Sequence, residues 1–102
     1  FTASDVFLTY GCHGALQTSF SVLASRGENV LVPKPSFPLV KAICENLGIE
    51  IRYFDLLPDK GWECDLDMMR RLIDDKTKAI QVVNPSNPCS VVWTKQHQLD
   101  II

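Results

Sequence analysis

The sequence predicts an α/β fold with a mostly parallel sheet and flanking helices. Short β-branched or apolar runs alternate along the 102 residues with stretches of helical periodicity, and Gly- or Pro-marked loops separate them. This alternation is typical of consecutive βα units. The composition, 46% hydrophobic and 22% charged, is that of a folded globular chain. No internal repeat or low-complexity segment interrupts the order, so we predict part or all of one domain over residues 1–102.

The first βα unit is expected near the start of the chain. Val6–Thr9 is a short apolar run that predicts a strand, and Tyr10–Gly14 leads from it into a helix. Leu16, Phe20 and Leu23 repeat at i, i+4 and i+7, which indicates one apolar face of that helix.

The second unit begins with the predicted strand Val30–Val32, after a helix stop at Gly27. The prolines that follow keep the chain extended, and Ser36 can cap the next helix. Gly48 is expected to end that helix. Its apolar side is predicted to consist of Phe37, Val40, Ile43 and Leu47.

Two more units complete the pattern. Ile49–Leu56 predicts a third strand, Pro58–Gly61 a turn, and Asp65 the cap of a third helix. Ala79–Val83 predicts a fourth strand. It runs into Asn84–Ser90, where two closely spaced prolines exclude a helix and favour a rigid loop. After this loop, Thr94 can cap a helix that continues to Ile102.

Charge and hydropathy restrict the classes of partner. The net charge of −2 and the pI near 5.5 leave no basic surface for nucleic acid. No apolar run approaches the roughly 18 to 20 residues of a membrane-spanning helix. The sequence starts without Met or a signal peptide, so we expect an internal segment of a longer chain. The four cysteines are scattered without a C-x-x-C pair, which favours reduced thiols and a cytoplasmic location.

Three loops at strand ends are the candidates for a binding site, because ligands of open parallel sheets bind at the carboxyl ends of the strands. Gly11, Cys12 and His13, with Gly14, open a helix whose N–H groups and dipole suit a phosphate. Taken alone, the two glycines are more often only a tight turn. Neither the G-x-G-x-x-G pattern nor a P-loop is present.

The other two loops contribute an aromatic ring and an amide. Phe37 could stack on a flat ring, although a core position is the commoner role for phenylalanine. Asn87 could hydrogen-bond a phenolate-like oxygen or a carboxylate, although asparagine in a Pro-rich loop is usually a turn former.

Other polar and aromatic residues favour structural roles. The acidic residues around the third helix suit its cap and its solvent face better than acid–base catalysis. His13 and His97 have no partners at metal-ligand spacing, so no metal site is predicted. Trp62 and Trp93 are expected to be packing residues. The acidic residues in question are Asp65, Asp67, Asp74 and Asp75.

Three segments carry distinctive motifs. Val82–Ser90 is V-V-N-P-S-N-P-C-S, Leu56–Leu66 is L-L-P-D-K-G-W-E-C-D-L, and Val32–Phe37 is V-P-K-P-S-F. They resemble the N-P-S-N-P-C-G loop, with Ser90 in place of Gly, and the L-L-P-x-x-x-W-E-x-D-L and V-P-x-P-x-F segments of the tyrosine aminotransferase branch. This branch belongs to the fold-type-I, class I/II aminotransferases that depend on pyridoxal 5'-phosphate (PLP). The matches keep their order and extend over nearly the whole chain.

The resemblance implies a role for each candidate residue. Gly11, Cys12 and His13 would hold the PLP phosphate, Phe37 would stack on the pyridine ring, and Asn87 would bond the 3'-oxygen and help to place the substrate carboxylate. The chain would be part of the large, three-layer PLP-binding domain. The family's Schiff-base lysine, pyridine-nitrogen aspartate and carboxylate-binding arginine would lie outside these 102 residues, so no catalytic residue is assigned within them.

The function implied is transfer of the amino group of tyrosine or a related aromatic amino acid to 2-oxoglutarate, by an enzyme that is a homodimer. The 102 residues alone are expected to be inactive. The alternative is a non-catalytic α/β module that keeps an aminotransferase-like scaffold and binds phosphate or a partner. A downstream aspartate, tyrosine and Ser-x-x-Lys would distinguish the enzyme from the module.

Overall fold

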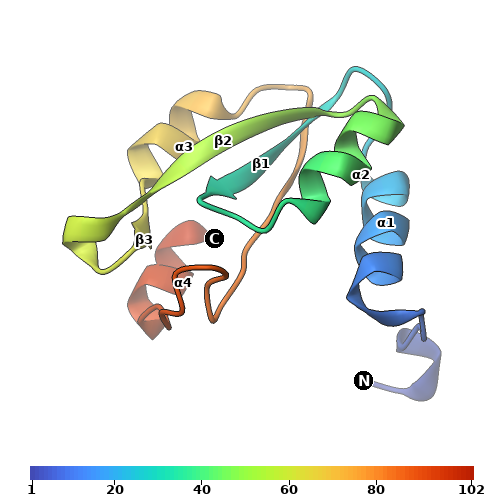
Figure 1. Cartoon of the computed structure of the whole chain (residues 1–102), viewed down its shortest axis with the longest axis horizontal. Helices are drawn as coiled ribbons and strands as arrows, with labels where there is room; N and C mark the ends of the chain where they lie inside the picture. The colour runs from blue at the N-terminus through green and yellow to red at the C-terminus, as the bar shows by residue number, and fades with distance from the viewer.

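A four-stranded sheet forms the centre of the molecule in the computed structural model, which describes residues 1–102 (Figure 1). The strand order is β3-β2-β1-β4. β1 is parallel to both β2 and β4, and only the two-residue β3 is antiparallel to its neighbour. The predicted mostly parallel sheet is therefore confirmed. The strands are β1 (Asn29–Lys34), β2 (Glu50–Leu57), β3 (Glu63–Cys64) and β4 (Thr77–Ile80).

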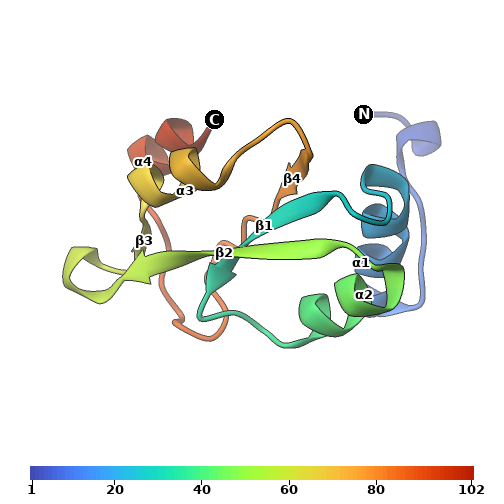
Figure 2. The same ribbon diagram turned by 90° about the horizontal axis from the view of Figure 1, so that it is seen from above.

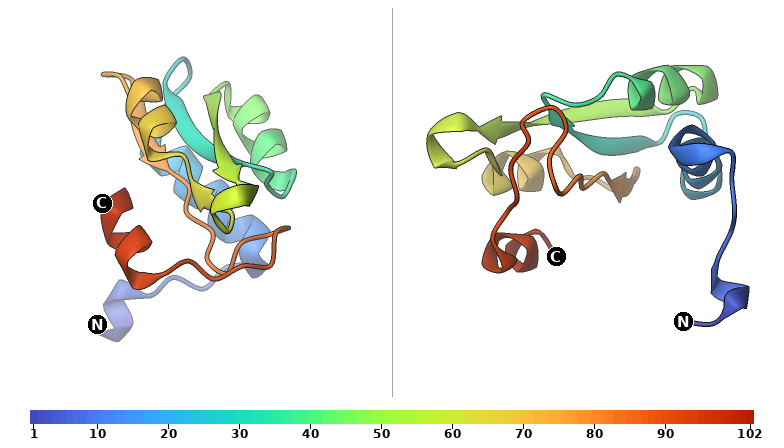
Figure 3. Two further views of the ribbon diagram at one scale, coloured as in Figure 1. Left: turned by 90° about the vertical axis from the view of Figure 1, so that its left-hand side faces the viewer. Right: turned by 60° about the horizontal axis from the view of Figure 1, so that its bottom comes forward.

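Helices cover both faces of this sheet, as Figures 2 and 3 show. Alternate side chains of β1 point to opposite faces: Val30 and Val32 join one apolar core, while Leu31 joins the other. The first core lies under α1 and α2, and the second lies under α3 and α4. The molecule thus has three layers, as predicted. The helices are α1 (Gly11–Leu23), α2 (Leu39–Leu47), α3 (Leu66–Leu72) and α4 (Lys95–Ile101), with short 3-10 turns at Ala3–Asp5 and Pro58–Lys60.

The helix caps follow the sequence closely. The Asp65 carboxylate accepts a hydrogen bond from the Met68 N–H at 2.9 Å, and the Thr94 hydroxyl accepts one from the His97 N–H at 3.1 Å. Gly48 ends α2 with a φ of 72°, a left-handed conformation that glycine adopts without steric cost. The prediction for Ser36 was wrong, because α2 begins only at Leu39 and its N-cap residue is Pro38, without a side-chain cap.

The predicted strand at Val6–Thr9 does not form. These residues are exposed and extended without sheet pairing, alongside α1 rather than at an edge of the sheet (Figure 2). A strand is defined by hydrogen bonds to a neighbouring strand, and the four strands of the sheet leave none beside this segment. Val6–Thr9 is therefore apolar, as a strand would be, but it makes no hydrogen bonds to a neighbouring strand.

The two tryptophans and His97 attach the C-terminal part of the chain to the sheet. Trp93 is buried in the second core, and its indole N–H donates to the Trp62 carbonyl at 2.9 Å. The imidazole of His97, 6% exposed, meets the edge of Trp93, and its Nε2 accepts the Cys64 N–H at 2.9 Å. The packing role predicted for Trp93 is confirmed.

No helix has the length and apolar composition needed to cross a membrane.

Candidate cofactor site

A largely apolar cavity of about 470 Å³ lies where β1 and β4 end and α1 begins. Segments distant in sequence contribute to it: the first turn of α1, the loop before α2, and the chain that follows β4. An apolar pocket with a few converging polar groups is the usual form of a small-molecule site. Its lining consists of Cys12, Leu16, Ser36, Phe37, Leu39, Val40, Gln81, Val82, Val83 and Asn87.

Phe37 reaches the cavity because the chain cannot resume a helix directly after β1. Two prolines, Pro35 and Pro38, separate the end of β1 from α2, so Phe37 lies in an extended connection. Its side chain is 58% exposed. The core role weighed for this residue therefore does not apply, and an aromatic ring is available to a ligand.

Asn87 belongs to a loop that is held by hydrogen bonds of its own. The Asn84 side-chain carbonyl accepts the Trp93 N–H at 3.1 Å. Within this frame, the Ser86 N–H donates to the Val91 carbonyl and the Ser90 N–H donates to the Ser86 carbonyl, each at 2.8 Å. None of these bonds uses the Asn87 amide, which remains available at the cavity wall.

The start of α1 is a sharp turn. Gly11 has a φ of 77°, its N–H donates to the Thr9 carbonyl at 2.9 Å, and its carbonyl accepts the Thr9 hydroxyl at 2.9 Å. No side chain caps the helix, so its first N–H groups, which lack intrahelical partners, carry the positive end of the helix dipole without protein neutralisation. Gly14 is buried under the Tyr10 ring, where an added Cβ would approach a ring carbon to 3.1 Å.

The structure brings together three of the five candidate residues, since Cys12, Phe37 and Asn87 line the same cavity. Gly11 does not line it but makes the turn that leads to Cys12. The His13 side chain lines a separate hollow of about 110 Å³ between α1 and α2.

Two polar residues of the cavity, Ser36 and Gln81, were not predicted from the sequence. Ser36 was interpreted as a helix cap, which obscured its position beside Phe37. Gln81 stands inside the apolar run Ala79–Val83. One polar residue within a predicted apolar strand was the signal that could have identified it.

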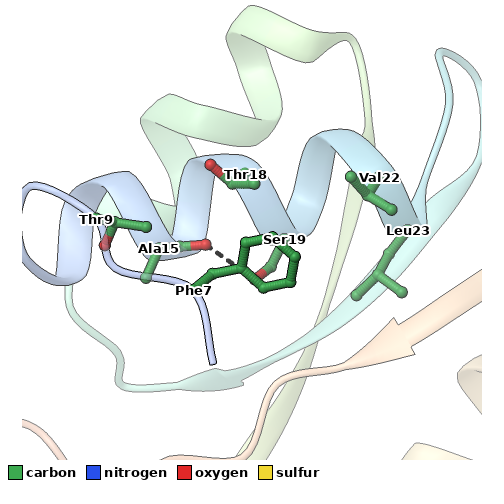
Figure 4. Close-up of a pocket in the computed structure, with 7 residues that line it drawn as sticks. All are labelled: Phe7, Thr9, Ala15, Thr18, Ser19, Val22 and Leu23. Atoms are coloured by element: carbon green, nitrogen blue, oxygen red, sulfur yellow. Dashed lines mark hydrogen bonds between the residues drawn. The ribbon is translucent and has the colours of Figure 1, made fainter. Parts of the chain in front are cut away.

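A second apolar hollow, of about 420 Å³, lies on the outer side of α1 (Figure 4). Phe7 lies across the helix there, beside the hydrogen bond from the Ser19 hydroxyl to the Ala15 carbonyl at 2.8 Å. Val22 and Leu23 close its far end and are exposed. Its polar lining residues are Thr9, Thr18 and Ser19, and it has no charged lining residue.

Comparison with known proteins identifies the class. The family model "Aminotransferase class I and II" matches residues 1–102, and the chain belongs to this family of enzymes. Tyrosine aminotransferase of Dictyostelium discoideum is 48% identical over 101 residues, which are 99% of this chain and 24% of the relative.

Solved structures agree with the fold. Tyrosine aminotransferase from Leishmania infantum superposes with a TM-score of 0.89 at 43% identity, covering 91% of this chain and 25% of its own. A PLP-bound C-S lyase from Staphylococcus hominis superposes with a TM-score of 0.91 at 22% identity, over 99% of this chain and 26% of its own. The chain spans about a quarter of the length of these relatives. Its fold is that of a segment of the fold-type-I aminotransferases.

Proposed function

We propose that this chain forms part of the PLP site of an aminotransferase that transfers the amino group of tyrosine or a related aromatic amino acid to 2-oxoglutarate. The observation that carries the proposal is the single cavity shared by Cys12, Phe37 and Asn87. Membership of the aminotransferase family and the 48% identity to a tyrosine aminotransferase support the substrate class.

The residues present fit PLP. Phe37 and the apolar walls offer a surface for the flat pyridine ring. The uncapped start of α1 offers N–H groups and a positive dipole to a dianionic phosphate. Asn87 offers an amide to the ring oxygen and to a substrate carboxylate. The ring face, the phosphate and the ring oxygen of the cofactor therefore each have a complementary group on this chain.

PLP, when bound, supplies the electron sink that transamination requires. The work of this chain is to bind and orient it. Phe37 would fix the plane of the ring, the start of α1 would fix the phosphate, and the apolar walls would exclude water from the ring face. No residue of this chain is assigned to form a covalent bond with the cofactor, so the 102 residues alone are expected to be inactive.

The test uses the full-length protein that contains this sequence. Phe37→Ala and Asn87→Ala should each weaken PLP binding about tenfold or more, equivalent to ~1.4 kcal/mol, as measured by absorbance titration of the apo protein. Leu99→Ala, on the exposed side of α4, is the control and should bind PLP normally. Production of the 2-oxo acid from tyrosine, with 2-oxoglutarate as acceptor, checks the reaction.

Alkylation of Cys12 gives an independent reading of where PLP binds. Cys12 is exposed and lines the cavity, so PLP should slow its reaction with iodoacetamide. Cys64 is an internal reference, because burial raises the pKa of its thiol to about 12 and keeps it unreactive in the folded protein. Wild-type protein that binds no PLP, or PLP that leaves Cys12 labelling unchanged, would refute the proposal.

Assembly and location belong to the same proposal. A homodimer is supported by the large apolar side chains exposed around the start of the chain, including Phe7, Leu8 and Tyr10. Light scattering of the full-length protein checks it, and a monomer at micromolar concentration would contradict it.

A cytoplasmic location is supported by four free thiols, two of them buried. Fractionation of cells that express the protein checks that part.

A further inference from the structure

The backbone of Gln81 is fixed at the carboxyl end of β4. Gln81 directly follows β4, and its N–H donates to the Leu31 carbonyl at 2.8 Å, which extends the pairing of β4 with the central strand β1 by one residue. Its side chain lines the cavity that contains Cys12, Phe37 and Asn87. This hydrogen bond fixes the backbone of Gln81 beside the cavity.

The Gln81 amide lacks a hydrogen bond that its burial requires. Its Oε1 is buried and has no hydrogen-bond partner, the only such side-chain atom in the molecule. Buried polar atoms in native proteins are almost always satisfied, and an unpaired acceptor lowers stability appreciably. The partner of this atom is therefore a group outside residues 1–102.

The surroundings indicate which kind of group this is. Seven of the ten residues that line the cavity are hydrophobic, and the three polar ones are Ser36, Gln81 and Asn87. No side-chain hydrogen bond within the chain uses any of these three. Unpaired polar groups that converge on an apolar cavity are the arrangement of a ligand site, whereas polar groups within a protein core are paired with one another.

We propose that Gln81 is a further positioning residue of this site, whose amide hydrogen-bonds a polar group of the bound cofactor. This inference rests on the proposed PLP function and adds a contact to it. Gln81 affects how PLP binds and how it is oriented. Its amide joins Ser36 and Asn87 as the third polar group that lines the cavity. Its Oε1 gains the missing hydrogen bond when PLP occupies the cavity.

The experiment compares apo and PLP-bound forms of the full-length protein for wild type, Gln81→Met and the control Gln17→Met. Gln17 lies on α1, is exposed and does not line the cavity, so its variant makes the same chemical change outside the proposed contact. Gln81→Met should leave the apo melting temperature unchanged or raise it, because an unpaired polar atom is removed. It should weaken PLP binding about tenfold and reduce the rise in melting temperature caused by PLP. Gln17→Met should change neither quantity.

Three results would overturn the inference while the proposed function stands. PLP affinity of Gln81→Met within twofold of wild type would show that the amide does not contact the cofactor. A fall in the apo melting temperature, or failure of the apo variant to fold, would show that the amide is paired with another part of the protein. Gln81→Asn, which keeps the amide but withdraws it from the cavity, should weaken PLP binding as well, and normal binding would count against the proposal. Wild-type protein that binds no PLP would instead refute the proposed function itself.

Discussion

Ser90 occupies a backbone conformation that a side chain resists. Its φ is 57°, and it stands at the position of the glycine in the N-P-S-N-P-C-G loop that Val82–Ser90 resembles. The Cβ of serine makes this left-handed conformation unfavourable by about 1 kcal/mol. Ser90→Gly should therefore raise the free energy of unfolding by about 0.5–1 kcal/mol, measured by chemical denaturation. Ser90→Ala keeps the Cβ and is the control. An equal gain in both variants would show that the hydroxyl, and not the backbone, is the cause.

Asp74 makes the stability of the folded protein depend on pH in the acid range. Hydrogen bonds from the Asn29 amide at 2.9 Å and from Arg52 at 2.7 Å lower the pKa of its carboxyl from 3.8 to about 2. Because the folded pKa is the lower one, the stabilisation is complete above about pH 4 and is lost as the pH falls toward 2. Asp74→Asn should be less stable than wild type at pH 6, with a smaller difference at pH 2.5, measured by urea denaturation. Asp59→Asn, on the exposed turn after β2, should show no such trend.

The helices are short elements that depend on their ends. α3 has seven residues, fewer than an isolated helix needs for stability in water, and the Asp65 carboxylate satisfies one of its free N–H groups. Asp65→Ala should lower the free energy of unfolding by about 1 kcal/mol, measured by thermal or chemical denaturation. Asp67→Ala removes a neighbouring, exposed carboxylate and should change it by less than about 0.5 kcal/mol. Equal losses would indicate a helix-dipole effect in place of a cap.

Local signals predicted three of the helix ends, although the local signal for a cap at Ser36 was wrong. The caps at Asp65 and Thr94 and the stop at Gly48 were predicted because each depends on residues within one turn. The prediction of a strand at Val6–Thr9 was wrong because a strand needs a partner strand, and a short apolar run gives no information about one.

At the scale of the whole molecule, topology did what residue patterns could not. The neighbouring parallel strands β1 and β4 end at one edge of the sheet, which brings Phe37 and Asn87 to one cavity. Cys12 reaches the same cavity from the first turn of α1, without a strand before it. The placement of the His13 side chain between α1 and α2 depends on how these two helices pack, which no local pattern encodes. The unpaired Oε1 of Gln81 likewise depends on how the side chains around it pack, which the sequence pattern does not encode. The cofactor roles of these residues remain predictions that the binding experiments address.

β1 contributes side chains to both apolar cores, and this affects how the protein unfolds. Its alternate side chains belong to separate cores on the two faces of the sheet, and it is the only strand with strand neighbours on both sides that are parallel to it. Neither helical layer can detach from the sheet and leave β1 intact, so the layers should unfold in one cooperative step. The amides of Val30–Val32 should therefore exchange with deuterium most slowly, at a rate set by global unfolding, while those of Val6–Thr9 should exchange almost at once. Native-state exchange followed by mass spectrometry measures both, and fast exchange in β1 would show that the layers open independently.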